Sequence, residues 1–348
     1  MLLVAMSNEP LTTLAAPMSS GLAQARARRA LRSLGVSDAV PLTRANSVTN
    51  EVWFTDDYVV RVNRHADLRL RREAVLAQDL PAEIGYPPVI QYGGELGADW
   101  LVVQRLPGQP LSRCWPTMAH GERRAAVRQL ADRLRIVHAT PCPPLDGLVD
   151  TPQLLDPAPT GQRAVHRLLG AVADAGRLPW VDPGIMGDIA AMVQADAGAL
   201  EPFDATTMVH GDVTFENVLW DRDHISSLLD FEFARPGPPD LDLDVLLRFA
   251  AYPFLHVPPA YENETRAADY ERVPWWLLED YPELFTVARQ FERIRLYSIA
   301  WDIKEVLSFP PQVSLHHVHS CHPYQRLVHV LRGTSYLDRL NGGLQIDW

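Results

Sequence analysis

The hydrophobic pattern of the chain changes abruptly at residues 107–110, which read Pro-Gly-Gln-Pro. Before this break, β-branched and aromatic residues gather in short runs that predict strands at 48–54, 58–62 and 100–106. After it, apolar residues recur at the helical spacing along most of the chain. Because Pro and Gly interrupt both kinds of element, the break predicts a junction between a small strand-rich part and a larger helical part.

The remaining elements follow from the same patterns. Helices are predicted at 23–34, 67–80, 122–138, 162–175 and 185–200, and again from residue 242 onward. Further short strands are predicted at 207–209, 218–220 and 225–229, and hairpin turns at 56–57 and 221–224. We therefore predict three regions: a flexible tail (1–20), an N-lobe (21–106) and a C-lobe (107–348).

Composition sets the broad class. A chain of 348 residues is long enough to bury the cores of two lobes, and its hydrophobic content of 47% is ordinary for a globular protein. No apolar run reaches the ~18–20 residues of a membrane-spanning helix, and the apolar first residues lack the basic lead of a secretory signal. Three widely spaced cysteines, an odd number, favour a reduced, cytoplasmic protein.

The net charge of −11 is unevenly distributed. Residues 1–109 hold 11 basic and 11 acidic side chains, whereas residues 110–348 hold 21 basic and 32 acidic ones. This excess of acid argues against a nucleic-acid partner or an anionic membrane surface. It favours a divalent metal and a cationic ligand, although an acidic surface that only aids solubility gives the same count. Lys304 is the single lysine; the other 31 basic residues are arginine.

The segment from 210 to 232 carries the strongest chemical pattern: His-Gly-Asp at 210–212, Asn217, and Asp-Phe-Glu at 230–232. Asp212 ends one predicted strand, while Asn217 and Asp230 flank the predicted hairpin. A hairpin brings its strand ends together, so all three side chains are expected at one rim. Two carboxylates and an amide oxygen suit Mg²⁺, and a carboxylate not used by the metal can accept a hydroxyl proton. The pattern therefore indicates phosphoryl transfer.

These residues resemble the motifs of the aminoglycoside phosphotransferase family, which includes choline-kinase-like small-molecule kinases. The resemblance covers about residues 40–250 and implies an α+β, bilobed, protein-kinase-like fold. Its small strand-rich N-lobe would contain one main helix, and its larger C-lobe would be mostly helical. ATP and Mg²⁺ would be the cofactors. Asp212 would be the catalytic base, His210 would brace its loop with support from Asp242, and Asn217 and Asp230 would hold the metal.

The same resemblance assigns nucleotide-binding residues in the N-lobe. Small polar residues at Ser47, Thr49 and Asn50 would form a turn over the phosphates. Arg61 would present a cation to the phosphates and pair with Glu73, and the backbone at Gln104 and Leu106 would bind adenine. Taken alone, the turn also fits a plain hairpin, and Glu73 also fits an exposed helical acid.

The sequence also departs from related kinases. Thr214 stands where the family often has histidine and protein kinases have lysine, so charge on the transferred phosphoryl group would come from elsewhere. Glu232 replaces the glycine of protein kinases. Asp242 lies twelve positions after Asp230, which leaves no room for a peptide-docking activation segment. A protein kinase is therefore disfavoured.

Acceptor-binding residues are expected in the C-lobe. The candidates are the acids Asp280, Glu283, Asp302 and Glu305, near the aromatic residues Trp275, Trp276, Tyr297 and Trp301. Carboxylates beside aromatic faces suit an ammonium group, although acids on amphipathic helices are commonly solvated. The histidine-rich segment 316–322 contains possible zinc ligands at a spacing that equally fits a solvated loop.

The sequence thus predicts an ATP-dependent O-phosphotransferase that acts on a small, cationic, aminoglycoside-like acceptor. Two alternatives remain. One is a metabolic kinase for an amino sugar, a choline-like alcohol or a homoserine-like alcohol. The other is a nucleotide-binding pseudokinase, which is disfavoured because Asp212, Asn217 and Asp230 are all present.

Overall fold

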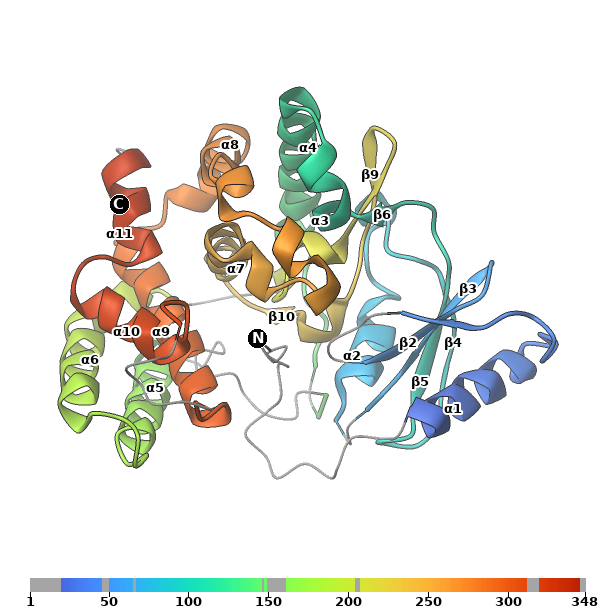
Figure 1. Ribbon diagram of the computed structural model, residues 1–348, viewed down its shortest axis with the longest axis horizontal. Helices are drawn as coiled ribbons and strands as arrows, with labels where there is room; N and C mark the ends of the chain where they lie inside the picture. Colours follow the sequence, from blue (N-terminus) through green and yellow to red (C-terminus); the bar gives the residue numbers. More distant parts are fainter. Residues whose placement is uncertain are drawn as a thin grey trace.

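The chain forms two lobes (Figure 1). The structure, a computed structural model, describes residues 20–45, 50–64, 67–145, 147–148, 161–203, 207–311 and 319–344. The predicted tail up to residue 19, Ser47 and Thr49, and residues 316–318 of the histidine-rich segment lie outside the described residues. The boundary drawn between residues 106 and 107 stays a prediction.

A five-stranded antiparallel sheet forms the N-lobe, in the order β1-β2-β3-β5-β4. Its strands are β1 (Thr43–Arg44), β2 (Glu51–Phe54), β3 (Tyr58–Val62), β4 (Val89–Gly93) and β5 (Trp100–Gln104). The hairpin between β2 and β3 and the strand β5 confirm the sequence prediction. The sequence pattern missed β1, which is only two residues long, and β4, whose pairing with β5 shifts register between Val89 and Gln91.

Two helices cover the two faces of this sheet. One face packs Val60, Val62 and Val102 against α1 (Ser20–Ser33), and the other packs Leu101 and Val103 against α2 (Arg69–Leu76). Besides α2, which faces the C-lobe, the N-lobe therefore has a second helix on its outer side (Figure 1). Because side chains alternate along a strand, Arg61 on β3 points to the α2 face, opposite to Val60 and Val62.

The C-lobe is mostly helical, as predicted. Its helices are α3 (Leu111–Cys114), α4 (His120–Ala139), α5 (Gly161–Ala175), α6 (Pro183–Asp196), α7 (Asp240–Ala251), α8 (Val273–Asp280), α9 (Gln290–Ser308), α10 (Pro323–Leu331) and α11 (Tyr336–Leu344). The predicted helix 185–200 is shorter, because a 3₁₀ turn replaces its last four residues. One large apolar core joins these helices. None of the described helices is both long and apolar enough to cross a membrane.

Short strands position the loops of the C-lobe. They are β6 (Gln109–Pro110), β7 (Met208–Val209), β8 (Val218–Asp221), β9 (His224–Leu228) and β10 (Arg235–Pro236). The predicted hairpin is present as β8 and β9, and β6 pairs with the outer edge of β8. Gly108 adopts φ 110° beside this edge, where a Cβ atom would lie 2.8 Å from the carbonyl oxygen of Trp220. The chain leaving the N-lobe is thereby held against the hairpin.

Candidate active site

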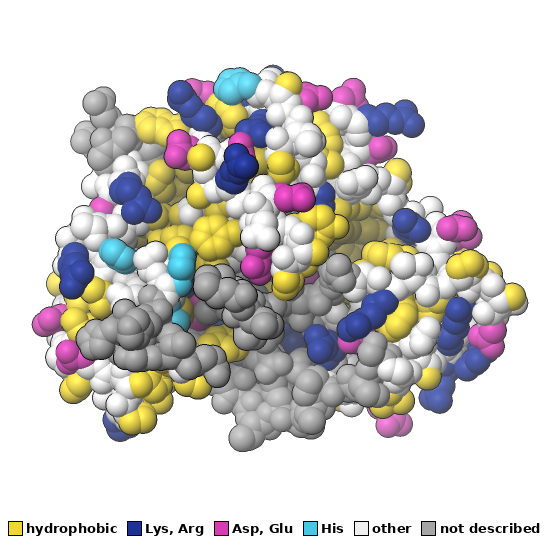
Figure 2. Space-filling model, in the orientation of Figure 1, with side chains coloured by type: hydrophobic (Ala, Val, Ile, Leu, Met, Phe, Trp, Pro, Cys, Tyr) yellow, Lys and Arg dark blue, Asp and Glu magenta, His cyan; other side chains and the backbone are white. Residues whose placement is uncertain are grey.

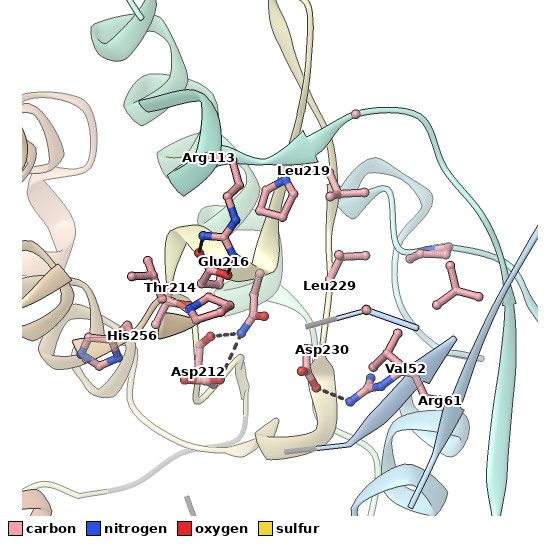
Figure 3. Close-up of a pocket in the computed structure, with 18 of the residues that line it drawn as sticks. Val52, Arg61, Arg113, Asp212, Thr214, Glu216, Leu219, Leu229, Asp230 and His256 are labelled. Atoms are coloured by element: carbon pink, nitrogen blue, oxygen red, sulfur yellow. Dashed lines mark hydrogen bonds and ion pairs between the residues drawn. The ribbon is translucent and has the colours of Figure 1, made fainter. Parts of the chain in front are cut away.

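A cavity of about 410 Å³ opens between the two lobes. On the face shown in Figure 2, a hollow lined by hydrophobic side chains lies between the N-lobe and the helices. We call the part of the cavity bounded by β2, β3, β5 and the β8–β9 hairpin the sheet half. The helical half is bounded by residues of α7, α9 and α10 and by residues 252–262. Figure 3 shows Asp212 and Asp230 between Arg61 on one side and His256 on the other.

The loop 210–217, which follows β7, carries Asp212 and Asn217. Gly211 adopts φ 80°, and a Cβ atom there would clash with the carbonyl oxygen of Phe233, so this position requires glycine. The Asn217 amide nitrogen donates to Asp212 twice, to the main-chain oxygen at 2.7 Å and to Oδ2 at 3.0 Å. The predicted juxtaposition of Asp212 and Asn217 is therefore present (Figure 3).

Asp242 supports the backbone of this loop, as the resemblance to the family implied. Its carboxylate accepts hydrogen bonds from the backbone N–H groups of His210 at 2.8 Å and Gly211 at 2.7 Å. His138 contacts the same carboxylate through Nε2 at 3.0 Å. The His210 ring is buried and lies 2.8 Å from the carbonyl oxygen of Leu229, and burial lowers its pKa. A neutral His210 thus ties the loop to the end of β9.

The surroundings of Asp212 disfavour the charged form of its carboxylate. Burial raises its pKa well above the usual range, and the carboxylates of Asp230 and Glu232 raise it further. Asp230 follows β9 with φ 66°, a left-handed conformation that turns its side chain into the cavity. Such a cluster of acids favours a nearby cation and strengthens Asp212 as a proton acceptor.

Arg61 supplies one such cation from β3. Its Nη2 atom donates to Asp230 Oδ1 at 2.7 Å and to Glu232 Oε2 at 2.9 Å, and Nη1 pairs with Glu73. The ion pair between Arg61 and Glu73 predicted from the sequence is present. Glu73 is fully buried, and the Tyr86 hydroxyl also donates to it at 2.8 Å.

Glu232 has a structural role that the sequence analysis missed. It is buried and accepts hydrogen bonds from Asn50 at 2.6 Å and from Arg61 at 2.9 Å, and it pairs with Arg69 at 3.5 Å. All three partners belong to the N-lobe, so one C-lobe carboxylate fixes the sheet against the site. Asn50, predicted to cover the phosphates, is buried in this network. A single sequence does not show that Glu232 is buried, so this role could not be predicted from it.

The sheet half can hold a flat aromatic ring. Its walls are apolar and come from both lobes: Val52, Val59, Val103, Leu219 and Leu229. Gln104 and Leu106 also line the cavity, and the binding of adenine by their backbone stays a prediction. The N–H of Gln104 already donates to the carbonyl oxygen of Pro88 at 2.9 Å, so a hydrogen bond from this residue to a base would use its carbonyl oxygen.

The four predicted acceptor acids divide into two pairs. Asp280 and Glu283 pair with Arg124 and Arg135 at the end of α8, and neither is among the described residues that line the cavity. The structure therefore does not bring these two acids to the site. Asp302 and Glu305 lie on α9, and both pair with Arg326 of α10. Of the four, only Glu305 is among the described residues lining the cavity.

The residues present suit a magnesium ion. Asp230 is partly exposed to the cavity, with 24% of its side chain accessible. The Asn217 amide nitrogen faces Asp212, which leaves Oδ1 as its possible ligand atom. Oxygen donors of this kind are those that Mg²⁺ prefers. Glu73 and Glu232 have oxygen atoms within 4.8 Å of Asp230, but arginine side chains already pair with both.

Sequence comparison identifies related proteins. The profile of a phosphotransferase enzyme family matches residues 41–276. The chain is 29% identical over 170 residues to the aminoglycoside 3'-phosphotransferase of Streptomyces ribosidificus. That match covers 47% of this chain and 59% of the relative, so it spans less than two thirds of the relative's length.

Several solved structures share the fold of this chain. The chain is similar to aminoglycoside 2'-phosphotransferase-IIIa in its GDP complex (TM-score 0.63, 14% identity, 90% of this chain and 98% of that one). It is also similar to the ADP-bound aminoglycoside phosphotransferase APH(2'')-Ib (0.61, 12%, 92% and 99%). A choline/ethanolamine kinase family protein from Mesorhizobium loti matches as well (0.54, 18%, 93% and 95%). At such identities the likeness concerns the fold, and it confirms the predicted bilobed, kinase-like architecture.

Proposed function

Because the chain belongs to the phosphotransferase enzyme family, we propose that it transfers the γ-phosphoryl group of ATP to a hydroxyl of a small, cationic acceptor of the aminoglycoside type. The observation that carries this proposal is the convergence of Asp212, Asn217 and Asp230 on a cavity that Arg61 also lines. The apolar sheet half would receive the base, and the acceptor would enter the helical half.

Asp212 is the proposed base. Its carboxylate would accept the proton of the acceptor hydroxyl as the oxygen attacks the γ-phosphorus, and the bond to the β–γ bridging oxygen breaks with release of ADP. Asn217 holds one oxygen of Asp212 at 3.0 Å, which orients the carboxylate. Because burial and two neighbouring carboxylates raise its pKa, Asp212 has a stronger affinity for the proton than an exposed aspartate.

Asp230 and Asn217 are the proposed ligands of Mg²⁺, which when bound would neutralise charge on the phosphate oxygens. Arg61, which also lines the cavity, would supply a positive charge to the phosphates. Its guanidinium is held by Glu73 and Glu232 in addition to Asp230, so it keeps its orientation if Asp230 turns to the metal.

The amino groups of the acceptor would meet carboxylates in the helical half. Among the described residues, Glu262 and Glu305 line this half, and Glu216 lines the cavity from the loop 210–217. Arg113 holds Glu216 with two hydrogen bonds of 2.6 Å each, and Arg326 pairs with Glu305. Glu262 is half-buried on the rim. A cationic acceptor therefore has one rim carboxylate and two carboxylates already shared with arginine.

The test is a screen for ADP release from Mg-ATP with aminoglycosides, amino sugars and amino alcohols as acceptors. We expect an aminoglycoside to give the highest kcat/KM, with mass spectrometry showing one added phosphoryl group. Asp212→Asn serves as the inactive control, and Asp223→Asn, on the exposed turn between β8 and β9, as the matched active one. A best acceptor among the amino alcohols would favour a metabolic kinase, and nucleotide binding without any turnover would refute the transferase.

A further inference from the structure

Arg248, at the end of α7, is held rigidly beside the helical half. Only 4% of this residue is exposed, and it is among the residues that line the cavity. Its Nη2 atom donates to Asp244, and its guanidinium lies 4.1 Å from the ring centroid of Trp301. A guanidinium with one edge in an ion pair and one face on an indole has little freedom to turn.

The other two nitrogen atoms of this guanidinium have no hydrogen-bond partner among the residues that the structure describes. Among the described residues, neither Nε nor Nη1 of Arg248 finds an acceptor, although both atoms are buried. Arg326, which lines the same cavity, differs: Nε donates to Asp302 at 2.8 Å, Nη1 to the Cys321 carbonyl at 2.7 Å, and Nη2 to Glu305. Buried donors are normally satisfied, and Arg248 as a residue lines the cavity, so a small ligand that reaches these two donors from the cavity would satisfy them.

The surroundings of Arg248 favour an anion as that ligand. Burial, together with Arg248 and Arg326, lowers the pKa of His256 to about 3. Burial also lowers the pKa of Lys304 to about 8, and Arg248 contributes to that shift. Lys304 and Arg248 both line a second cavity of about 60 Å³ behind Trp301. Arg326 engages both Asp302 and Glu305, so among the described residues neither acid accepts from the two unmatched donors of Arg248.

Arg248 also lies near the proposed base. Asp212 and Arg248 line the same cavity, Asp212 from the loop 210–217 and Arg248 from α7. Thr214, in the same loop, lines the cavity and carries no charge. The loop itself therefore offers no cation at the position where related kinases often carry one.

We propose that the Nε and Nη1 atoms of Arg248 form an oxyanion-binding subsite beside Asp212, which rests on the proposed phosphotransfer for its role. A guanidinium edge with two N–H groups fits two oxygens of one phosphoryl or carboxylate group. Two sources share this chemistry: the phosphoryl group in transfer, and a carboxylate on the acceptor. Arg248 would then neutralise charge that Thr214 cannot.

Binding of two small probes tests this without requiring turnover. Inorganic phosphate, titrated by calorimetry into the full chain saturated with ADP and Mg²⁺, stands for the phosphoryl group. Glycerate, compared with glycerol, stands for an acceptor carboxylate. Arg248→Gln should weaken at least one oxyanion ~10-fold or more, as expected for a lost charge-assisted hydrogen-bond pair. Arg295→Gln is the matched control, because it breaks an arginine–aspartate pair with Asp196 outside the cavity.

The outcomes separate the sources. Weaker phosphate binding assigns the subsite to the transferred phosphoryl group, and weaker glycerate binding alone assigns it to the acceptor. Unchanged binding of both probes in Arg248→Gln, or a wild-type chain that binds neither, overturns the proposal. Should Arg248→Gln fail to fold, Arg248→Lys replaces it, because lysine keeps the charge but lacks the paired N–H groups of the guanidinium. The affinity for the oxyanion should then fall ~3-fold or more. Unchanged affinity in Arg248→Lys would overturn the proposal. An absence of phosphorylated product bears on the proposed function and not on this binding test.

Discussion

The two halves of the cavity are built differently. In the sheet half, Arg61, Asp230 and Glu232 form one connected ion-pair network that spans both lobes. In the helical half, arginines engage acids in separate pairs on helices, and Arg248 keeps two donors unmatched. In the first half the described ion pairs join the two lobes without a ligand, whereas in the second half Arg248 has two buried donors that a ligand would satisfy.

This difference reflects what each half would bind. A nucleoside triphosphate presents the same phosphates to every kinase, so a fixed set of cations and carboxylates is sufficient to bind it. An acceptor varies in charge and shape, and its site must be set by side chains from several helices. Variants of the sheet half should therefore affect chemistry and folding, and variants of the helical half should affect acceptor recognition.

The largest expected effect is at Asp212. Asp212→Asn should lower kcat by ~10²–10⁴-fold, because the amide cannot accept the hydroxyl proton. Steady-state ADP release measures this loss, and calorimetry should show Mg-ATP affinity within a few-fold of wild type. Turnover within a factor of a few of the Asp223→Asn control would remove Asp212 from the role of base.

Next in size is the loss of the connection between the lobes at Glu232. Glu232→Ala should lower the free energy of unfolding by about 3–5 kcal/mol, because Arg61, Arg69 and Asn50 lose a buried partner. Denaturant unfolding measures the change. Glu279→Ala is the control, since it breaks an exposed pair with Arg124 and should change stability little. Equal stability of the two variants would show that the network does not hold the lobes.

Metal binding should respond more moderately. Asp230→Asn should weaken Mg-ATP binding ~10–100-fold and reduce activity with it, because one anionic ligand is lost. Calorimetry with and without Mg²⁺ separates the metal contribution, and a chelator should abolish wild-type turnover. If Mg-ATP affinity stays at the wild-type value, Glu73 or Glu232 must hold the metal instead.

The smallest effects distinguish the two pairs of acceptor acids. Asp280→Asn and Glu283→Gln should leave the acceptor KM within ~2-fold, because neither acid is among the described residues that line the cavity and both pair with arginines elsewhere. Glu305→Gln should raise the acceptor KM more than the ATP KM. Raising the ionic strength should raise the acceptor KM if the acceptor is cationic, since exposed attraction is screened within ~8 Å at physiological salt. A larger effect at Asp280 than at Glu305 would mean that the acceptor binds outside the cavity.

Sequence alone located the sheet half well, for a local reason. Asp212, Asn217 and Asp230 lie close together along the chain and are joined by one hairpin, so their spacing predicts their meeting. The pair Arg61 and Glu73 was expected from the resemblance to the kinase family, which implies a cation on this strand and an acid on the next helix. These residues were placed without knowledge of how the lobes pack.

The helical half could not be placed in this way. Whether Asp280 or Glu305 reaches the cavity depends on how α8 and α9 rotate against α4, α7 and α10, which a helical repeat does not specify. The charge count in 110–348 was a weak guide for the same reason: it does not reveal that arginines already engage Asp280, Asp302 and Glu305. Glu232 and Arg248 were missed because burial, not residue type, gives them their roles.

The single lysine gives this protein a built-in attachment point for a reporter. Burial lowers the pKa of Lys304 to about 8, so more of its amine is unprotonated near neutral pH than in an ordinary lysine. An amine-directed label should therefore react at one side-chain position. Because Nζ lies 5.0 Å from the centroid of the Trp301 ring, the label would sit against an indole whose other neighbour is Arg248. Quenching or energy transfer at that pair would then follow, in real time, the arrival of a molecule in the helical half.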